Sequence, residues 1–286
     1  MAAGKIIVGF DNSADAKAAA RWALDTAELT GAAVEFFYAY QWPDWLPATA
    51  TIGAPAVQPD GEIDRAVHGM LNEVRASARE THPSVPTDAS IVHASAALTL
   101  IGRSAEASLI VLGSRGHSGV VGLLGSVSVA VSENATCPVV VVRGVPRPGG
   151  PILVGVDDSA PAQAALRFAA EQARLRKVAL RVIRAWLPGN GIGDPTPAAS
   201  LMVTADEQHA FDTLIGSVRA DHPEVEITGE TVVEHPAAAL VRASADAGLL
   251  VVGTRGRSPV RGMLLGSVSQ HVLRHSAASV AVVHGT

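Results

Sequence analysis

The chain has 286 residues, a length that favours two domains of ordinary size. Its 48% hydrophobic and 17% charged residues exclude a disordered chain, and its net charge of −5 without a basic run argues against a duplex nucleic-acid binder. Cys137 is the single cysteine, which excludes an intrachain disulfide, a thiolate zinc site and a CxxC redox pair. No apolar segment reaches membrane-spanning length, so we expect a cytoplasmic protein that binds neither nucleic acid nor membrane.

Short apolar runs alternate with Ala-rich stretches along the first half. The runs "KIIVGF", "VEFFYAY", "ASIVH", "SLIVLG" and "PVVVV" do not alternate with polar residues, which is typical of strands covered on both faces. The first Ala-rich stretch predicts a helix from about Ser13, a good N-cap, to Gly31, a good C-terminal stop. Together these elements predict an α/β fold of doubly wound parallel sheets with helices on both faces.

The second half repeats the first. "KIIVGFDNSADAKAAARWAL" at 5–24 matches "PILVGVDDSAPAQAALRFAA" at 151–170, and "ASLIVLGSRG" at 107–116 matches "AGLLVVGTRG" at 247–256. The order is preserved, so a unit of about 140 residues is duplicated in tandem. In the second copy the first helix is expected to begin at Ser159, with Pro161 in its first turn.

Domain bounds follow from this repeat. We expect one domain at 1–144, a Pro/Gly-rich linker at 145–150 and a second domain at 151–286. Two further Pro/Gly-rich insertions, at 43–62 and 187–200, are predicted to be mobile flaps.

Each half carries a glycine-rich stretch after its fourth strand, "GSRGHSGVVGLLGSVS" at 113–128 and "GTRGRSPVRGMLLGSVS" at 253–269. In open parallel sheets, ligands bind beyond the carboxyl ends of the strands, where the strand order reverses. Glycines before a helix start offer free N–H groups at a positive helix end, which suits a phosphate chain. A Walker A loop is excluded because the lysines lie elsewhere, at Lys5, Lys17 and Lys177, and no GxGxxG follows the first strand.

This spacing resembles the ATP-binding signature of the universal stress protein family, G-x2-G-x9-G-[ST], and the resemblance covers nearly the whole chain as two tandem domains. It implies two Rossmann-like (flavodoxin-like) sheets, with adenine held by main chain near Ala39 and Ala185. It also implies Asp11 and Asp157 near the base and ribose, and phosphates at the glycine loop, with the hydroxyls of Ser126, Ser128, Ser267 and Ser269 as donors. The nucleotide-binding residues assigned in this way are Gly9, Asp11, Ala39, Gly113, Arg115, Gly116, Gly125, Ser126, Val127, Ser128, Gly155, Asp157, Ala185, Gly253, Arg255, Gly256, Gly266, Ser267, Val268 and Ser269.

The two loops differ in length. Gly256 and Gly266 are separated by the full nine residues, whereas Gly116 and Gly125 are separated by eight. One missing residue moves the phosphate donors by up to about 3.5 Å, although Gly119 and Gly122 make the short loop more pliable. The sequence therefore predicts unequal sites and one or two bound ATP per chain, which Mg can accompany, with the second-half site the better one.

Several candidates have a plainer reading. Asp11 and Asp157 could cap the first helix of each half, but Ser13 and Ser159 are available for that. Arginine side chains that could pair with phosphate could equally be solvated; these are Arg115, Arg255 and Arg261. His271 and His275 have metal-ligand spacing but no evident third ligand, and no catalytic arrangement forms around His93, His117 or His235. Trp22, its counterpart Phe168 and Cys137 are most simply core residues.

The resemblance implies an ATP-binding regulator of stress response or growth arrest with little or no ATP turnover, acting through an unknown protein partner. We expect its halves to pack as a pseudo-dimer through the last strands, "VVVVR" and "VAVVH", and a homodimer is possible. A slow ATPase or nucleotidyl transferase, with Asp157 and Asp158 as the only candidate carboxylate cluster, remains an alternative. An interaction scaffold with vestigial sites is a third.

Overall fold

The computed structural model describes residues 4–40, 61–116, 124–144, 146–186, 205–256 and 265–285. The two predicted insertions lie outside these residues, except that Gly61 and Glu62 begin a helix. His117, Gly119, Gly122 and Arg261 also lie outside them. Within the described part of the chain no helix combines the length and apolarity that crossing a membrane requires.

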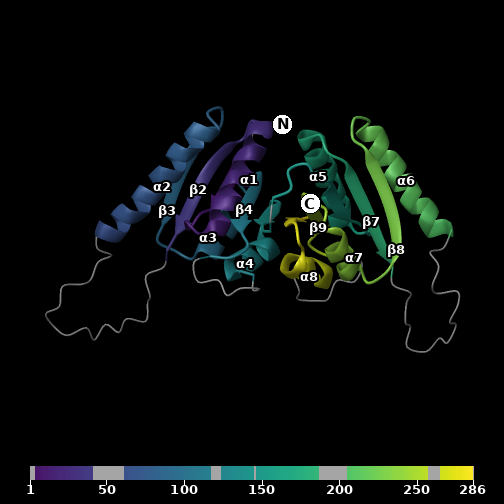
Figure 1. Cartoon of the computed structure of the whole chain (residues 1–286). Coiled ribbons are helices and arrows are strands. Elements are labelled where there is room, and N and C mark those ends of the chain that lie inside the picture. Colours follow the sequence, from purple (N-terminus) through teal and green to yellow (C-terminus); the bar gives the residue numbers. More distant parts are fainter. Residues whose placement is uncertain are drawn as a thin grey trace, which may run out of the picture.

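The elements alternate between strand and helix in both halves, as the sequence predicts (Figure 1). The first half contains β1 (Lys5–Gly9), α1 (Ala14–Thr30), β2 (Ala33–Ala39), α2 (Gly61–Thr81), β3 (Thr87–Val92), α3 (Ala96–Arg103), β4 (Leu109–Gly113), α4 (Ser126–Asn134) and β5 (Val139–Val142). The second half contains β6 (Ile152–Gly155), α5 (Ala160–Arg176), β7 (Leu180–Trp186), α6 (Ala205–Asp221), β8 (Ile227–Val233), α7 (Pro236–Ala243), β9 (Leu249–Gly253), α8 (Ser267–His275) and β10 (Ser279–Val283).

The ten strands form one sheet in the order β3-β2-β1-β4-β5-β10-β9-β6-β7-β8. Within each half all pairs are parallel, and the order is that of a Rossmann sheet rather than the flavodoxin order. β5 and β10 pair antiparallel, with Val141 opposite Val280 and Val139 opposite Val282. This confirms that the last strands pair, and it joins the two predicted sheets edge to edge, so that neither half leaves its last strand exposed.

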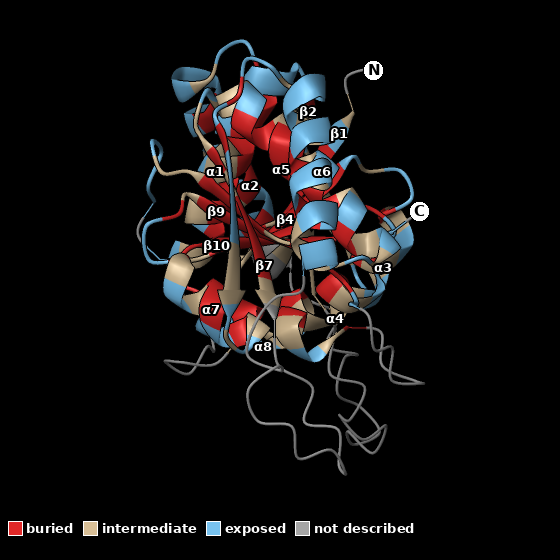
Figure 2. Cartoon of the chain, turned by 90° about the vertical axis from the view of Figure 1, so that its right-hand side faces the viewer, coloured by how far each residue is buried: buried red, intermediate tan, exposed pale blue. Residues whose placement is uncertain are grey.

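Helices cover both faces of the sheet. One face packs against α1, α2, α5 and α6 in a hydrophobic cluster that continues across both halves, and the other face packs against α3 and α4 or α7 and α8. Neighbouring strand residues such as Ile6 and Ile7 therefore belong to different clusters, which explains why the strands are apolar without alternation. Figure 2 shows the buried residues along the strands and the inward faces of the helices.

The predicted helix ends are confirmed. The Ser13 hydroxyl accepts the Ala16 N–H at 3.1 Å, and Gly31 ends α1 with φ +71°, a conformation that glycine adopts without strain. In the second half Ser159 caps α5 in the same way, with Pro161 in the first turn. The capping serines fix where each first helix begins after its strand.

Glu35 of β2 is buried in an ion cluster that ties four elements of the first half together. Arg103 of α3 donates to both carboxylate oxygens at 2.6 and 2.7 Å, Lys5 of β1 at 2.9 Å and Ser90 of β3 at 2.5 Å. Hydrogen bonds from three donors compensate the buried charge. The corresponding position of the second half is Arg181, whose closest carboxylate contact is the exposed Glu230 at 3.7 Å.

Candidate functional site

A cleft lies in each half at the point where the strand order reverses. In the first half it opens between the carboxyl ends of β1 and β4 with a volume of about 600 Å³, and in the second half between β6 and β9 with about 430 Å³. Both volumes are typical of small-molecule sites. All the nucleotide-binding residues that the family resemblance assigns to the first half line the first cleft, and all those assigned to the second half line the second. The residues separated in sequence are thus brought together as expected.

The first glycine of each loop lets a helix approach the strand end. A Cβ on Gly113 would lie 2.7 Å from the carbonyl carbon of Asp15, and one on Gly253 would lie 2.8 Å from that of Pro161. Real side chains do not tolerate such distances, so glycine is required for the first turns of α1 and α5 to pack here. The same contact places the start of these helices beside the cleft.

The second glycine of each loop lies against the aspartate that follows the first strand. A Cβ on Gly116 would lie 2.8 Å from Oδ2 of Asp11, and one on Gly256 would lie 2.6 Å from Oδ2 of Asp157. The Oδ1 atom of Asp11 accepts the backbone N–H of Ser13 at 3.0 Å, which holds the carboxylate in place. The serine caps the helix, and the aspartate braces the preceding turn and lines the cleft.

Each glycine loop ends at the start of a helix that has no side-chain cap. Gly125 and Gly266 are the N-caps of α4 and α8, and their own N–H groups donate to the carbonyls of Ser114 and Thr254 at 2.8 and 2.7 Å. The first-turn N–H groups that follow, at 126–128 and 267–269, belong to residues that line the clefts. A helix start of this kind favours an anion because its N–H groups lack intrahelical acceptors.

Two of the four serine hydroxyls predicted as phosphate donors already have backbone acceptors in the structure. The buried hydroxyls of Ser128 and Ser269 donate to the carbonyls of Gly113 and Gly253 at 2.8 and 2.6 Å. A hydroxyl has one proton, so these serines tie the helix start to the end of β4 or β9 instead of offering that proton to a ligand. Ser126 and Ser267, two residues earlier, are exposed in the clefts and suit the donor role.

Arg115 and Arg255 line the two clefts with different partners. Arg115 forms an ion pair with Asp15, Nε to Oδ2 at 3.1 Å, and Ser114 donates to the same oxygen at 2.6 Å. Burial acts to raise the pKa of Asp15, but the hydrogen bonds from Arg115 and Ser114 outweigh it and hold that pKa below its usual value.

Proline replaces this carboxylate in the second half, because position 161 corresponds to position 15. Arg255 is exposed, and among the described residues no carboxylate lies within salt-bridge distance of it. The second cleft therefore has a cation available for a ligand, whereas that of the first cleft is neutralised. The repeat alignment already contained this difference, which sequence reasoning missed.

The other chemistry-bearing residues have structural partners. Asp158 lies 3.1 Å from Nη2 of Arg184, a buried side chain of β7. His235 caps α7 by accepting the Ala237 N–H, and His93 contacts the hydroxyl of Tyr40. The rings of His271 and His275 lie 4.4 Å apart on α8, and no group of three potential metal ligands occurs in the described ranges.

The Rossmann strand order occurs twice, with a glycine-lined cleft and an uncapped helix start in each half, and this defines a tandem α/β protein with two clefts whose geometry suits an anion. The family model described as "Universal stress protein family" matches residues 3–143 and 150–284. The chain therefore belongs to the universal stress protein family, with two such domains in tandem.

Similar proteins support this assignment over nearly the full length. The chain is 35% identical to universal stress protein Rv2623 of Mycobacterium tuberculosis, covering 97% of this chain and 95% of that protein. It is 32% identical to universal stress protein Rv2005c of the same organism, again covering 97% and 95%. A solved universal stress protein from Archaeoglobus fulgidus DSM 4304 has the same fold, with a TM-score of 0.70 at 21% identity, covering 99% of this chain and 97% of that one.

Proposed function

We propose that the chain binds ATP in its two clefts and acts as a regulator of stress response or growth arrest, with little or no ATP turnover. One observation carries the proposal. In each cleft a helix start without a side-chain cap lies near an aspartate at a strand end, and a backbone N–H two residues later holds the carboxylate in place. We also propose a cytoplasmic location, a protein partner, and a division into domains 1–144 and 151–286 joined by 145–150.

The proposed orientation of the nucleotide is the one that the family resemblance implies, and the geometry of the cleft supports it. The triphosphate faces the N–H groups at the start of α4 or α8 and the hydroxyl of Ser126 or Ser267. Asp11 or Asp157 lies beside the second glycine of the loop, at a suitable place for the ribose. The adenine then reaches the main chain at Ala39 or Ala185, at the end of the neighbouring strand. Mg can accompany the phosphates.

We propose that the second cleft binds ATP more tightly than the first. The longer glycine loop of the second half is one reason, and the available guanidinium of Arg255 is an independent one. A charge-assisted hydrogen bond to phosphate is worth about 1.5 to 3 kcal/mol in favourable cases. Arg115 would have to leave Asp15 before it could make the same contact.

Slow turnover is the less favoured alternative. A phosphoryl-transfer site needs a positioned base and carboxylates for the metal. Asp158 forms an ion pair with Arg184, and Asn12 occupies the corresponding position of the first half. Among the described residues, neither cleft therefore presents a pair of carboxylates placed to hold a metal.

The direct test is to denature the purified full chain and analyse the released nucleotide by mass spectrometry, followed by calorimetric titration of the nucleotide-free chain with ATP. We expect one or two adenine nucleotides per chain and a saturable heat signal. A chain that carries no nucleotide and shows no heat of binding near millimolar ATP would refute the proposal. Sustained ADP release that disappears in Asp158→Ala would favour the enzyme instead.

A further inference from the structure

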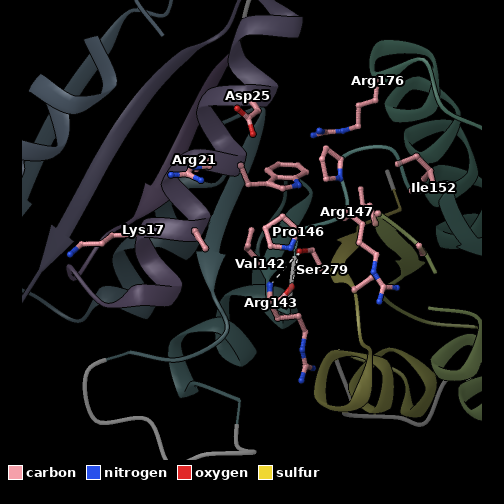
Figure 3. A pocket seen from close by; sticks show the side chains of 18 residues that line it. Lys17, Arg21, Asp25, Val142, Arg143, Pro146, Arg147, Ile152, Arg176 and Ser279 are labelled. Carbon is pink, nitrogen blue, oxygen red and sulfur yellow. Dashed lines mark hydrogen bonds between the residues drawn. The ribbon is translucent and has the colours of Figure 1, made fainter. Parts of the chain in front are cut away.

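The two halves enclose a third cavity, separate from both clefts. It has a volume of about 310 Å³ and lies between α1 and α5, beside the segment that joins the halves (Figure 3). Trp22, Arg176, Pro146 and Pro148 form much of its wall, and strand residues of both halves close it on the sheet side. None of its described lining residues lines either cleft. Residues of both halves and of the segment that joins them line the cavity.

Arg176 points from α5 into this space (Figure 3). Its guanidinium carbon lies 4.7 Å from the centre of the Trp22 ring. The Nη2 atom of Arg176 donates to Thr26 Oγ1 at 2.7 Å, and its Nε atom donates to Gln172 Oε1 at 3.3 Å. Both acceptors are uncharged, and within the described ranges no carboxylate lies within salt-bridge distance of this arginine. A partly buried guanidinium stays charged, and the nearby Asp25 carboxylate acts on it through space without an ion pair or hydrogen bond between these two described side chains.

The surroundings of the cavity are positive. Four further cationic residues line it: Lys17, Arg21, Arg143 and Arg147. The side chains of Lys17 and Arg21 point away from the cavity (Figure 3), and Arg143 donates to the Leu273 carbonyl. Asp25 is the single acidic residue of the described lining, and its carboxylate lies 3.0 Å from Nε2 of His82. In a chain of net charge −5, this concentration of cations around one cavity attracts anions.

Packing of the two halves against each other does not by itself require the positive charge of Arg176 at this place. In the repeat, Phe168 corresponds to Trp22 and Thr30 corresponds to Arg176, so the contact has no counterpart on the other side of the junction. Two apolar side chains would fill the same seam without desolvating a cation. The combination of an aromatic face, two prolines and a guanidinium without a direct ion pair among the described residues is instead what a ligand with a flat apolar part and an anionic group requires.

We propose that this cavity binds a small organic anion, with its carboxylate or phosphate group on Arg176 and its planar part against Trp22 and the prolines. The volume is near the lower end for small-molecule sites and suits a single substituted ring. The anion compensates Arg176, and the ring excludes water from the seam between α1 and α5. This proposal is independent of ATP binding in the clefts.

The probe is 5-fluorosalicylate, a planar carboxylate, titrated into the full chain and followed by ¹⁹F NMR in the presence of excess ATP. We expect saturable binding with a Kd of about 1 mM or tighter. Arg176→Met keeps the apolar stem and removes the charge, and should weaken binding about tenfold. Arg174→Met is the matched control, because Arg174 lies on the same helix outside the cavity and pairs with Glu171. The Arg174→Met variant should bind 5-fluorosalicylate with the affinity of the unmodified chain.

Competition distinguishes the anionic groups. Displacement of the probe by benzoate but not by inorganic phosphate supports a carboxylate ligand, and displacement by phenyl phosphate at lower concentration supports a phosphate ester. No saturable binding up to about 10 mM, or an unchanged affinity in Arg176→Met, would overturn the proposal. Should Arg176→Met melt too early to titrate, Trp22→Phe, which copies the counterpart residue of the second half, must weaken binding for the proposal to stand.

Discussion

Arg115 and Asp15 form an ion pair at the edge of the first cleft, whereas the corresponding positions of the second half hold Arg255 and Pro161. The carboxylate that neutralises one guanidinium is thus absent beside the other. A one-residue difference in the first turn of a helix gives the two clefts different charges, although their glycines and aspartates are arranged alike.

Removing the carboxylate from the first half and introducing one in the second should reverse the order of the ATP affinities of the two clefts. Asp15→Ala frees Arg115 and is expected to raise the ATP affinity of the first cleft about three- to tenfold, the effect of one partly solvated charge-assisted contact. Pro161→Asp should lower the affinity of the second cleft by a similar factor. Calorimetry resolves each cleft when the other is disabled by Gly116→Val or Gly256→Val, since a larger side chain there collides with Asp11 or Asp157.

Adenosine, which lacks phosphates, is the matched control ligand. Its affinity should not change in Asp15→Ala or Pro161→Asp. If the affinities for ATP and adenosine change together, or if neither affinity changes, the guanidinium does not contact the phosphates. The ranking of the two clefts then loses this support.

The two serines of the second helix start should separate binding from stability. Ser267→Ala is expected to weaken ATP binding several-fold with little change in the free energy of unfolding, because its hydroxyl is exposed in the cleft. Ser269→Ala leaves the Gly253 carbonyl without its donor in a buried place, and should lower the unfolding free energy by about 1 to 3 kcal/mol. Urea unfolding of the nucleotide-free chain and calorimetry measure the two effects.

The first-half pair, Ser126→Ala and Ser128→Ala, repeats the comparison in the weaker cleft. Ser126→Ala should weaken ATP binding less than Ser267→Ala does. Ser128→Ala should lower the unfolding free energy about as much as Ser269→Ala does, because Ser128 makes the equivalent hydrogen bond. A larger loss of ATP affinity in Ser126→Ala than in Ser267→Ala would reverse the proposed ranking.

Local sequence patterns predicted the elements and the location of the clefts. Ser13 and Gly31 delimit α1 through hydrogen bonds and backbone conformations that depend on neighbours four residues away or closer. The apolar last strands predicted the junction, because each would otherwise leave an unpaired apolar edge, which is unfavourable. The gathering of the candidate residues follows from the parallel topology.

Contacts between distant residues were not predictable in this way. Whether Ser128 donates to a phosphate or to Gly113 depends on the distance from the helix start to the end of β4, which only the packed structure supplies. The Arg115–Asp15 pair joins residues that are 100 positions apart. The cavity beside Arg176 arises from the way α1 and α5 meet across the antiparallel junction, and nothing in either half by itself indicates it.

Cys137 should be unreactive in the folded chain. It is buried, and burial raises the pKa of its thiol to about 11, so little thiolate forms near pH 8. Labelling with a disulfide reagent at pH 8 should be at least about a hundredfold slower than for glutathione in the same buffer, and should reach the glutathione rate in denaturant. Fast labelling of the folded chain would mean that the α4–β5 connection opens readily.

The ion cluster around Glu35 should make stability depend on acid pH. Burial alone would raise the pKa of Glu35, but hydrogen bonds from Arg103, Ser90 and Lys5 outweigh it and lower that pKa from 4.5 to about 2. The unfolded chain therefore takes up the proton first as the pH falls, and the stabilisation present above about pH 4.5 is lost between 4.5 and 2. The full difference corresponds to about 3 kcal/mol as an upper limit.

Urea unfolding between pH 7 and pH 3 measures this dependence. Glu35→Gln should be less stable at pH 7, because Arg103 loses its buried partner, and its stability should fall less steeply with acid than that of the unmodified chain. Glu230→Gln is the control, since that exposed carboxylate lies 3.7 Å from Arg181 and should change stability by less than about 0.5 kcal/mol. Parallel acid profiles for Glu35→Gln and the unmodified chain would show that other carboxylates dominate, because only a group whose pKa differs between the folded and unfolded states can give the profile its slope.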